Sequence, residues 1–297
     1  MNCDPTSPPQ TVWTVQALLR WTTRFFESKG IESARLDGEL LLAHALGWKR
    51  IDLYARYDHV PSAAALARFR EMVRARGLQR IPSKYLTGET EFFSLPLAVS
   101  PSVLIPRPET ELLVERALEL LAKDQEALVG DLGTGSGAIA IAVAARRPLA
   151  RVVATDVSEQ ALAVATANAE RHGLAARIEF RRGDWFAALD PGARFDALLA
   201  NPPYVATPDL DQAMPEVRDH EPRVALDGGP DGLACLRVLI AGGPSWLRPG
   251  GWLVVEIGAG QGDAVAQLAR ETKAYATVQV TPDYQGIPRI AAMQSKT

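Results

Sequence analysis

Apolar residues in the first eighty positions recur at the three- and four-residue spacing of amphipathic helices. The stretch "TVQALLRWTTRFFESKG" begins with Thr14, a residue type that caps helix starts, and ends with Gly30, a typical helix stop. Two further stretches, "SARLDGELLLAHALG" and "PSAAALARFREMVRARG", repeat the pattern. The core-facing positions expected on these two helices are Leu36, Leu40, Ala43, Leu46, Leu66, Phe69 and Val73. The pattern predicts three or four short helices forming a small bundle over about residues 10–80.

The pattern changes after Pro82. The stretch "EFFSLPLAVSPSVLIPRP" is rich in aromatic and β-branched residues interrupted by serine and proline, which predicts a short hairpin or an extended connector. From about residue 107 onward, short apolar runs alternate with helical patterns. The expected strands are 127–132, 151–156, 177–182, 195–200, 252–257 and 276–280. Such alternation is typical of βαβ units and predicts an α/β fold with a mostly parallel sheet covered by helices on both faces.

One strand of the alternating region leads directly into a glycine loop and a helix. The stretch "LVGDLGTGSGAIAIAVAARR" places Gly133, Gly135 and Gly137 before the helix expected at 138–146. Glycine tolerates positive φ and lets a ligand lie against bare backbone, beside the free N–H groups of a helix start. About 20 residues further on, the next strand ends in Asp156, where doubly wound folds bind ribose hydroxyls. These features favour a nucleotide-type site over a simple tight turn.

The spacing of these glycines separates two ligand classes. The dinucleotide fingerprint is G-x-G-x-x-G, whereas the glycines here alternate in G-T-G-S-G, and Asp131 stands two residues before the first. This arrangement resembles that of class I methyltransferases, whose methyl donor S-adenosylmethionine has no pyrophosphate. The resemblance implies that, in "GDWF", Asp184 binds the adenine amino group and Trp185 packs on the ring. An ordinary core position for Trp185 is the alternative.

The stretch "LLANPPYVA" ends the fourth strand of the alternating region. Ligands in such sheets bind beyond the carboxyl ends of strands, so Asn201 is expected on the same rim as the glycine loop. Asn201 precedes a proline and is therefore held extended, while Pro202 and Pro203 have carbonyls but no N–H groups. The loop thus offers the Asn201 side-chain oxygen and the Pro202 carbonyl as acceptors, and Tyr204 adds an aromatic face. This set suits a planar –NH2 group, provided that the Asn201 amide turns its oxygen toward the ligand.

The chemistry expected of this loop is the activation of a weak nucleophile. A planar nitrogen reacts poorly because its lone pair is delocalised, and two acceptors that hold its protons favour a more pyramidal, electron-rich nitrogen. A sulfonium methyl is already activated, so close in-line placement supplies much of the remaining catalysis without a strong base. Enzymes that share Asn-Pro-Pro-Tyr act on adenine in DNA, guanine in ribosomal RNA or glutamine in protein. The motif alone leaves these acceptors open.

Longer stretches resemble one family closely, the glutamine methyltransferases that modify peptide-chain release factors. They are "YLTGETEFFSLPLAVSPSVLIPRPETELLVERAL", "NPPYVA", "EPRVALDGGPDGL", "DYQGIPRIAAM" and, near the start, "ARLDGELLLAHALG". The resemblance covers nearly the whole chain and is most specific in "LIPRPETE". It implies an N-terminal helical substrate-docking domain over residues 1–84, a hairpin connector over 85–106 and a methyltransferase domain over 107–297. The last is expected to have the Rossmann-like class I fold, with a mostly parallel seven-stranded sheet.

The resemblance also implies the reaction and its residues. The methyl group of S-adenosyl-L-methionine would pass to the side-chain amide nitrogen of the glutamine in a release factor's Gly-Gly-Gln loop, leaving S-adenosyl-L-homocysteine. The positions expected to contact the donor are Gly133, Thr134, Gly135, Ser136, Gly137, Asp156, Asp184, Trp185 and Asn201. Those expected to hold the acceptor are Asn201, Pro202, Pro203 and Tyr204, of which Asn201, Pro202 and Tyr204 are the expected catalytic residues.

Two further features each allow more than one interpretation. Arg107 and Glu109 either close over the donor or form an ion pair at the start of the following helix. A second G-x-G-x-G, in "VVEIGAGQGDAVAQLA", also lies between an expected strand and an expected helix. It is interpreted as a turn between late elements of the sheet, because too little chain follows it to complete a ligand site.

Composition and charge limit the partners. A net charge of −3 argues weakly against a nucleic-acid-binding protein, so no stable nucleic-acid partner is expected. The Arg-rich stretch 68–84 is either a solvated helix face or a patch for an acidic partner. If that patch binds nucleic acid, the rival hypothesis is an amino-methyltransferase acting on a base of DNA or ribosomal RNA.

The same composition bears on metals and cellular location. The two cysteines, Cys3 and Cys235, and the scattered histidines match no disulfide or metal-site spacing, so no metal is expected. No apolar run reaches the ~20 residues of a membrane span, and the first ten residues lack a signal-peptide pattern. These features predict a cytoplasmic enzyme without a membrane partner.

Overall fold

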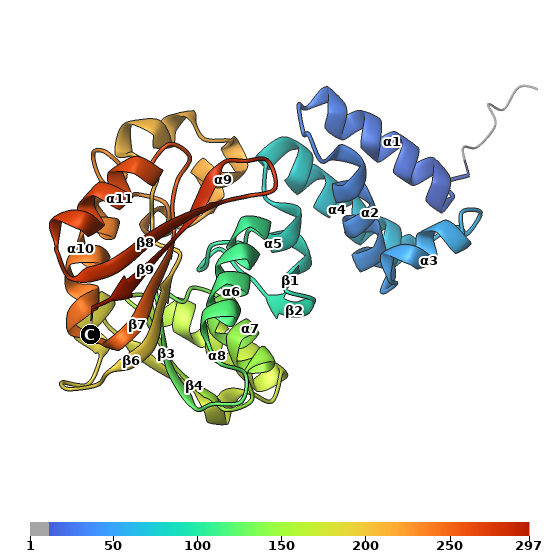
Figure 1. The fold of residues 1–297 in the computed structure, drawn as a ribbon. Coiled ribbons are helices and arrows are strands. Elements are labelled where there is room, and N and C mark those ends of the chain that lie inside the picture. The colour runs from blue at the N-terminus through green and yellow to red at the C-terminus, as the bar shows by residue number, and fades with distance from the viewer. Residues whose placement is uncertain (1–11, 297) are drawn as a thin grey trace, which may run out of the picture. The chain divides into compact units, whose positions relative to one another are not determined.

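The computed structural model of the chain describes residues 12–296 and divides into two compact units after Thr87 (Figure 1). The expectations for the first ten residues, on the signal peptide and on Cys3, lie outside the described residues. Within residues 12–296, no helix is both long enough and apolar enough to cross a membrane.

The N-terminal unit is a helical bundle, as the apolar spacing predicts. Thr14 caps the first helix by accepting a hydrogen bond from the Ala17 N–H at 3.2 Å, and Gly30 follows its end with φ +68°. Phe26, Leu42 and Phe69 are among the buried side chains of its core. The helices are α1 (Val15–Ser28), α2 (Ala34–Leu46), α3 (Arg50–Ala55), α4 (Ala63–Gln79) and α5 (Ser83–Thr87).

Helix α2 turns a different side to the core from the one that its leucine spacing predicts. Leu36 is 43% exposed, so its predicted core position is wrong, while Leu40 and Leu46 are only partly buried. Ala43 is buried as predicted, and the rest of the apolar buried stripe runs through Ala34, Gly38, Leu41, Leu42 and Ala45. Gly38 explains the rotation, because it lets α1 come close: a Cβ at this position would lie 3.3 Å from Thr22 Cγ2.

A buried ion pair crosses this bundle. Asp37 accepts hydrogen bonds from Arg76 Nε at 2.7 Å and from Ser83 Oγ at 2.8 Å, which ties α2 to α4 and α5. Arg76 is therefore part of the bundle core and not of a solvated helix face or a surface patch. Arg68 and Arg80 donate to the backbone carbonyls of Ala45 and Lys29, so both also stabilise the bundle.

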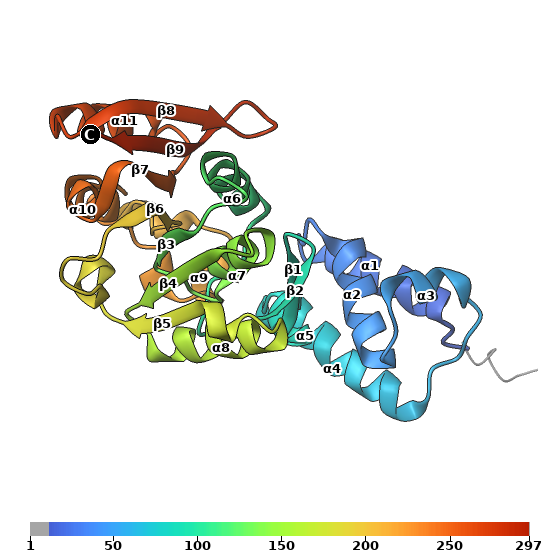
Figure 2. The same ribbon diagram turned by 60° about the horizontal axis from the view of Figure 1, so that its bottom comes forward.

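The C-terminal unit begins with the expected hairpin, in which β1 (Glu89–Phe92) pairs antiparallel with β2 (Leu95–Ala98). A seven-stranded sheet follows, in the order β5-β4-β3-β6-β7-β9-β8 (Figure 2). Its parallel strands are β3 (Ala127–Leu132), β4 (Ala150–Asp156), β5 (Ile178–Arg182), β6 (Phe195–Ala200) and β7 (Leu247–Glu256). The antiparallel strands are β8 (Tyr275–Pro282) and β9 (Pro288–Ser295). The prediction of a mostly parallel seven-stranded sheet is confirmed.

Helices cover both faces of this sheet, as the strand–helix alternation predicts. One apolar cluster joins the sheet to α6 (Pro108–Leu120), α7 (Ala138–Arg146) and α8 (Glu159–Arg171), which lie together in Figure 2. A second cluster joins the opposite face to α10 (Ala234–Gly242) and α11 (Gly262–Glu271). The short helix α9 (Pro215–His220) lies in the long connection between β6 and α10. Strands buried on both faces bring their carboxyl ends to one rim.

Candidate active site

A cavity of about 860 Å³ opens at this rim, within the C-terminal unit. The predicted site residues on its wall are Gly133, Thr134, Gly135, Ser136, Asp156, Asp184, Trp185, Asn201 and Pro203. Gly137, Pro202 and Tyr204 are not part of the wall, although each follows or precedes a residue that is. The structure therefore brings the glycine loop and the Asn-Pro-Pro-Tyr loop, about 65 residues apart in sequence, to one cavity.

The glycine loop joins β3 to α7. Gly135 has φ +56°, and a Cβ placed on it would meet no atom within 4 Å, so this glycine presents bare backbone to the cavity. Gly137 is constrained differently, because its Cβ would lie 3.1 Å from the side chains of Ala165 and Ile141. Gly135 thus leaves room for a ligand to approach, whereas Gly137 allows close helix packing.

Asp156 holds this loop from the end of β4. Its Oδ2 accepts a hydrogen bond from the Gly135 N–H at 2.9 Å, and its Oδ1 accepts one from the Ser158 N–H at 2.9 Å. Each carboxylate oxygen has more than one acceptor position, so both can also accept from ligand hydroxyls. The predicted ribose-binding carboxylate is therefore fixed in place by the loop beside which the ligand would lie.

Asp131 braces the loop from inside. It is fully buried on β3, and its Oδ2 accepts hydrogen bonds from Thr134 Oγ1 at 2.6 Å and from the Ala140 N–H at 3.1 Å. Burial raises the pKa of this carboxyl group from its usual value to about 7, against the opposing effect of both hydrogen bonds. Asp131 therefore shapes the loop without reaching the cavity wall.

Trp185 lies against the glycine loop and the core at once. A Cβ on Gly133 would lie 3.2 Å from its ring, and the same ring packs against the apolar cluster beneath α10. Its φ of +45° is uncommon for a residue with a side chain, which indicates that the neighbouring packing imposes this conformation. Trp185 thus has the core contacts of the alternative interpretation, and both Trp185 and Asp184 lie on the cavity wall.

Asn201 is oriented by a chain of hydrogen bonds. Its Nδ2 donates to Thr110 Oγ1 at 3.0 Å, and the Thr110 hydroxyl donates to Glu256 Oε2 at 2.6 Å. Thr110 has one proton, so a hydroxyl that donates to a carboxylate is an acceptor for the amide N–H2. The Asn201 side-chain oxygen is left available as an acceptor, which is the orientation that the proposed chemistry needs.

Tyr204 contacts the same carboxylate. Its hydroxyl donates to Glu256 Oε1 at 3.2 Å, and burial, followed by the nearby negative charge of Glu256, raises the pKa of the phenol. The ring was expected to offer an aromatic face, whereas the hydrogen bond identifies Tyr204 as an anchor of its loop. Thr110 lies in the stretch "LIPRPETE" and Glu256 just before the second glycine loop, but no role was predicted for either, because nothing in these stretches shows that the two side chains meet Asn201.

The second glycine loop, between β7 and α11, is filled by its own side chain. Gln261 accepts a hydrogen bond from the Gly258 N–H at 2.8 Å and donates to the carbonyls of Tyr204 and Gly232 at 3.0 and 3.2 Å. Its interpretation as a turn between late elements is confirmed. Gln261 also braces the Asn-Pro-Pro-Tyr loop from behind.

Arg107 pairs with Glu221 and not with Glu109. The Arg107 Nη2 to Glu221 Oε2 distance is 2.6 Å, and the Glu221 side chain is 1% exposed. Glu221 opens the stretch 221–233, whose residues Pro222 to Asp227 supply much of the opposite cavity wall. An ion pair does form at the start of α6. It joins Arg107 to the segment that forms this wall and does not join two residues of the helix start to each other.

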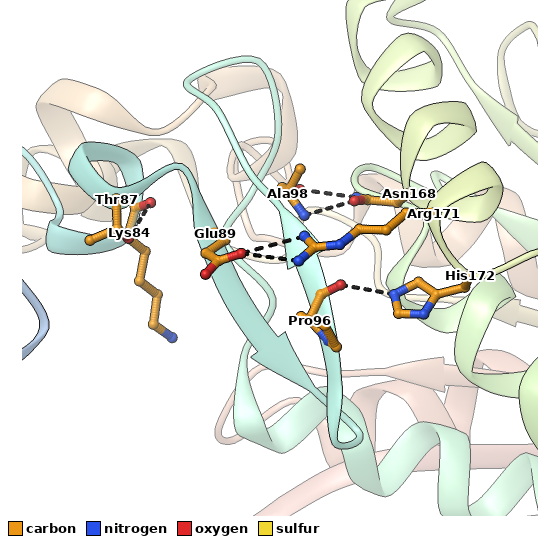
Figure 3. Close-up of polar contacts among 8 residues, drawn as sticks. All are labelled: Lys84, Thr87, Glu89, Pro96, Ala98, Asn168, Arg171 and His172. Carbon is orange, nitrogen blue, oxygen red and sulfur yellow. Dashed lines mark hydrogen bonds and ion pairs between the residues drawn. The ribbon is translucent and has the colours of Figure 1, made fainter. Parts of the chain in front are cut away.

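Asn168 connects the hairpin to the glycine loop, and Figure 3 shows its contacts with the hairpin. This fully buried side chain on α8 accepts from the Ala98 N–H at 2.7 Å and donates to the Ala98 carbonyl at 3.0 Å and the Ser136 carbonyl at 2.9 Å. One turn further along the helix, His172 contacts the Pro96 carbonyl at 2.8 Å. The hairpin is therefore fastened to α8, which also holds the glycine loop, and the sequence did not indicate this connection.

Comparison with known proteins follows this division of the chain. Residues 17–88 match the family described as PrmC N-terminal domain, and residues 108–217 match the family described as Methyltransferase small domain. The fold is similar to that of a methyltransferase from Pyrococcus furiosus, with a TM-score of 0.52 and 17% identity over 69% of this chain and 91% of the other. The human Mettl16 catalytic domain gives a TM-score of 0.55 and 16% identity over 77% and 81%. These likenesses show the methyltransferase fold alone.

Sequence relatives are much closer. The chain is 44% identical over 279 residues to the release factor glutamine methyltransferase of Geobacter sulfurreducens, covering 94% of this chain and 96% of that protein. It is 47% identical over 278 residues to the enzyme of the same name from Moorella thermoacetica, covering 93% and 96%. The matched stretches cover more than 90% of this chain and of each relative, and the chain belongs to the family of release factor glutamine methyltransferases.

Proposed function

We propose that this enzyme transfers a methyl group from S-adenosyl-L-methionine to the side-chain amide nitrogen of the glutamine in the Gly-Gly-Gln loop of a peptide-chain release factor. Relatives that match this chain over 96% of their own length carry the name of this activity. The observation that supports the chemistry is the hydrogen bond from Asn201 Nδ2 to Thr110, which leaves the Asn201 oxygen to accept from an –NH2 group. Since release factors act at ribosomes, we infer the cytoplasm as the place of action.

The cavity fits such a donor. Gly135 leaves its backbone open where a side chain would intrude, and Asp156 offers carboxylate oxygens for the ribose hydroxyls. We assign the adenine amino group to Asp184 and the face of the adenine ring to Trp185, both on the cavity wall. The remaining proposed donor contacts are Gly133, Thr134, Ser136 and Asn201. Gly137, which was also expected to contact the donor, is not on the cavity wall and acts through helix packing.

Bound S-adenosyl-L-methionine supplies an activated sulfonium methyl group and leaves as S-adenosyl-L-homocysteine. Asn201 Oδ1 and the Pro202 carbonyl hold the two N–H protons of the glutamine amide, and they orient its lone pair toward the methyl carbon. These acceptors retain both protons until the nitrogen–carbon bond forms and the carbon–sulfur bond breaks, after which one proton leaves to solvent. Tyr204, held by Glu256, and Pro203 keep the loop in place.

The N-terminal unit is assigned to substrate docking, and the segment 85–106 is assigned to connecting it with the methyltransferase domain at 107–297. The match of residues 17–88 to the family's own N-terminal domain supports a role that is specific to this enzyme class. This unit also carries exposed apolar side chains, among them Trp21 at 49% and Ile51 at 69% exposed. Such side chains are typical of protein-binding surfaces.

The experiment uses labelled donor with two forms of a release factor, one natural and one with the Gly-Gly-Gln glutamine changed to alanine. We expect label on the natural form and none on the alanine form. Equal labelling of both would overturn the proposal. DNA and ribosomal RNA are tested beside them, and transfer to a nucleic acid that falls steeply with salt would support the rival amino-methyltransferase. Three arginines of stretch 68–84 hold the bundle together, which weakens the argument that this stretch is a nucleic-acid-binding patch.

A further inference from the structure

Glu256, the last residue of β7, is a buried carboxylate with both oxygens in use. Oε2 accepts from the hydroxyl of Thr110, in the first turn of α6, and Oε1 accepts from the hydroxyl of Tyr204. A single carboxylate therefore joins a strand end, a helix start and the Asn-Pro-Pro-Tyr loop. Buried carboxylates are uncommon unless hydrogen bonds or ion pairs satisfy them, as the two hydroxyl groups do here.

The direction of these hydrogen bonds is set by the number of protons available. An ionised carboxylate can only accept, so the one Thr110 proton is committed to Glu256 and the Thr110 oxygen is left to accept. Asn201 must then turn its N–H2 group toward Thr110 and its oxygen away from it. Without this constraint, the Thr110 hydroxyl could donate to the Asn201 oxygen, and the amide could turn by about 180° without losing a hydrogen bond.

We infer that Thr110 and Glu256 are positioning residues that fix the Asn201 amide with its oxygen toward the acceptor nitrogen. The inference rests on the proposed function and adds to it the device that orients the catalytic side chain. A turned amide would present N–H2 to the glutamine N–H2, two donors facing each other. The orientation of one amide thus decides whether the acceptor nitrogen is held at all.

The charges around Glu256 affect the pH range in which this carboxylate is ionised and can orient Asn201. Burial, as the largest effect, raises the pKa of Glu256, and Glu109 on α6 acts in the same direction. The hydrogen bonds from Thr110 and Tyr204 and the charge of Arg289 on β9 oppose them. Arg107 acts on the neighbouring Tyr204, where its charge opposes the rise of the pKa of the phenol. Since protonation of Glu256 would release the Thr110 proton, the turnover rate is expected to fall on the acid side of this raised pKa.

The first test compares Thr110→Val, which keeps the shape and removes the hydroxyl, with Thr110→Ser, which keeps the hydroxyl. We expect Thr110→Val to lower kcat roughly 10- to 100-fold, the effect of about one unsatisfied polar group, with KM and donor Kd nearly unchanged. Thr110→Ser should stay within about threefold of the natural enzyme. Thr166→Val on α8 is the matched control, because that threonine donates to the Leu162 carbonyl and is not among the residues of the cavity wall.

The second test measures orientation without turnover. Exchange of the Asn201 side-chain N–H2 protons with solvent, followed by NMR and assigned by the signal lost in Asn201→Asp, should be slow in the natural protein and faster in Thr110→Val. Glu256→Gln, whose amide oxygen can still accept from Thr110, should lose the acid decline of kcat that the natural enzyme shows.

Three outcomes would overturn the inference. They are natural kcat in Thr110→Val, equal amide exchange in Thr110→Val and the natural protein, and an unchanged acid decline in Glu256→Gln. Failure of the natural enzyme to methylate a release factor would instead reject the proposed function. In that case the amide exchange experiment still decides the orientation, so the two failures can be told apart.

Discussion

The backbone N–H of Gly135 donates to the carboxylate of Asp156 at 2.9 Å, joining the middle of the glycine loop to the tip of β4. Two features that the sequence separates by twenty positions are thus one structural unit. The residue that would bind the donor's hydroxyls also holds the loop against which the donor would lie. Substitutions at either position should therefore act on donor binding more than on the chemical step.

Gly135→Val is expected to abolish most donor binding. Its side chain would point into the cavity, where no protein atom now lies within 4 Å of the Cβ position. Gly260→Val is a close control, because Gly260 also has positive φ and an open Cβ position but lies in the second glycine loop. Both changes carry a similar backbone strain of about 1–2 kcal/mol. Isothermal titration should show at least a roughly tenfold weaker donor Kd in Gly135→Val alone, and equal weakening in both would contradict the assignment.

Asp156→Asn should weaken donor binding about 10- to 100-fold. Both carboxylate oxygens accept backbone N–H groups, from Gly135 and from Ser158, so an asparagine must turn its N–H2 toward one of these donors. The loop would shift and one acceptor for the ribose would be lost. Asp190→Asn, at an exposed carboxylate paired with Arg181, should leave the donor Kd unchanged. Natural affinity in Asp156→Asn would remove Asp156 from the donor site.

Asn201→Ala should act on the acceptor. We expect kcat to fall by roughly 100-fold or more, because the amide acceptor that orients the glutamine nitrogen is gone, while donor Kd stays within about threefold. Single-turnover rates with a release factor, together with titration of the donor, separate the two effects. An Asn201→Ala enzyme with natural turnover would show that the nitrogen is held elsewhere.

Asn168→Leu should lower both stability and donor affinity. The change leaves the Ala98 N–H, the Ala98 carbonyl and the Ser136 carbonyl without their partner, the first two in a partly buried place and the third in a buried one, a loss of about 2–4 kcal/mol. His172→Ala touches the same hairpin at an exposed position and should change the free energy of unfolding by less than about 0.5 kcal/mol. Urea unfolding with and without donor measures both, and equal effects of the two changes would argue against a special role for Asn168.

The sequence predicted what repeats along the chain and missed what joins distant segments. Strands β3 and β6 and the start of α8 follow directly from apolar runs and from the cap residue Ser158. Strand β9 was not among the expected strands. Its apolar run Ile290–Met293, which the structure buries, could have indicated one. The exposed side of α2 was misjudged because Gly38, not a leucine, determines how closely α1 packs.

The candidate site shows the same contrast between local motifs, which the sequence predicts, and contacts between distant segments, which it does not. Its motifs place Gly135, Asp156 and Asn201 at one rim, because strand ends of a parallel sheet meet there. Thr110 lies within the stretch "LIPRPETE" and Glu256 just before the second glycine loop, but only the distances of 3.0 and 2.6 Å within one chain of hydrogen bonds connect them to Asn201. Contacts over 91 and 146 positions leave no local pattern to detect.

Asp131 should give the free enzyme a measurable loss of stability between about pH 4 and pH 7. Burial disfavours its charged form and raises its pKa from 3.8 in the unfolded chain to about 7 in the fold, so the folded protein keeps a proton that the unfolded chain releases. Folding stability therefore falls as pH rises through this window, by at most about 1.4 kcal/mol per pH unit, and levels off above it. Asp131→Asn removes the titration and keeps an oxygen for Thr134 and Ala140. Urea midpoints at pH 5, 6, 7 and 8 should show the natural protein losing stability relative to Asp131→Asn up to about pH 7; parallel curves would mean that the buried carboxyl group is already ionised at pH 5.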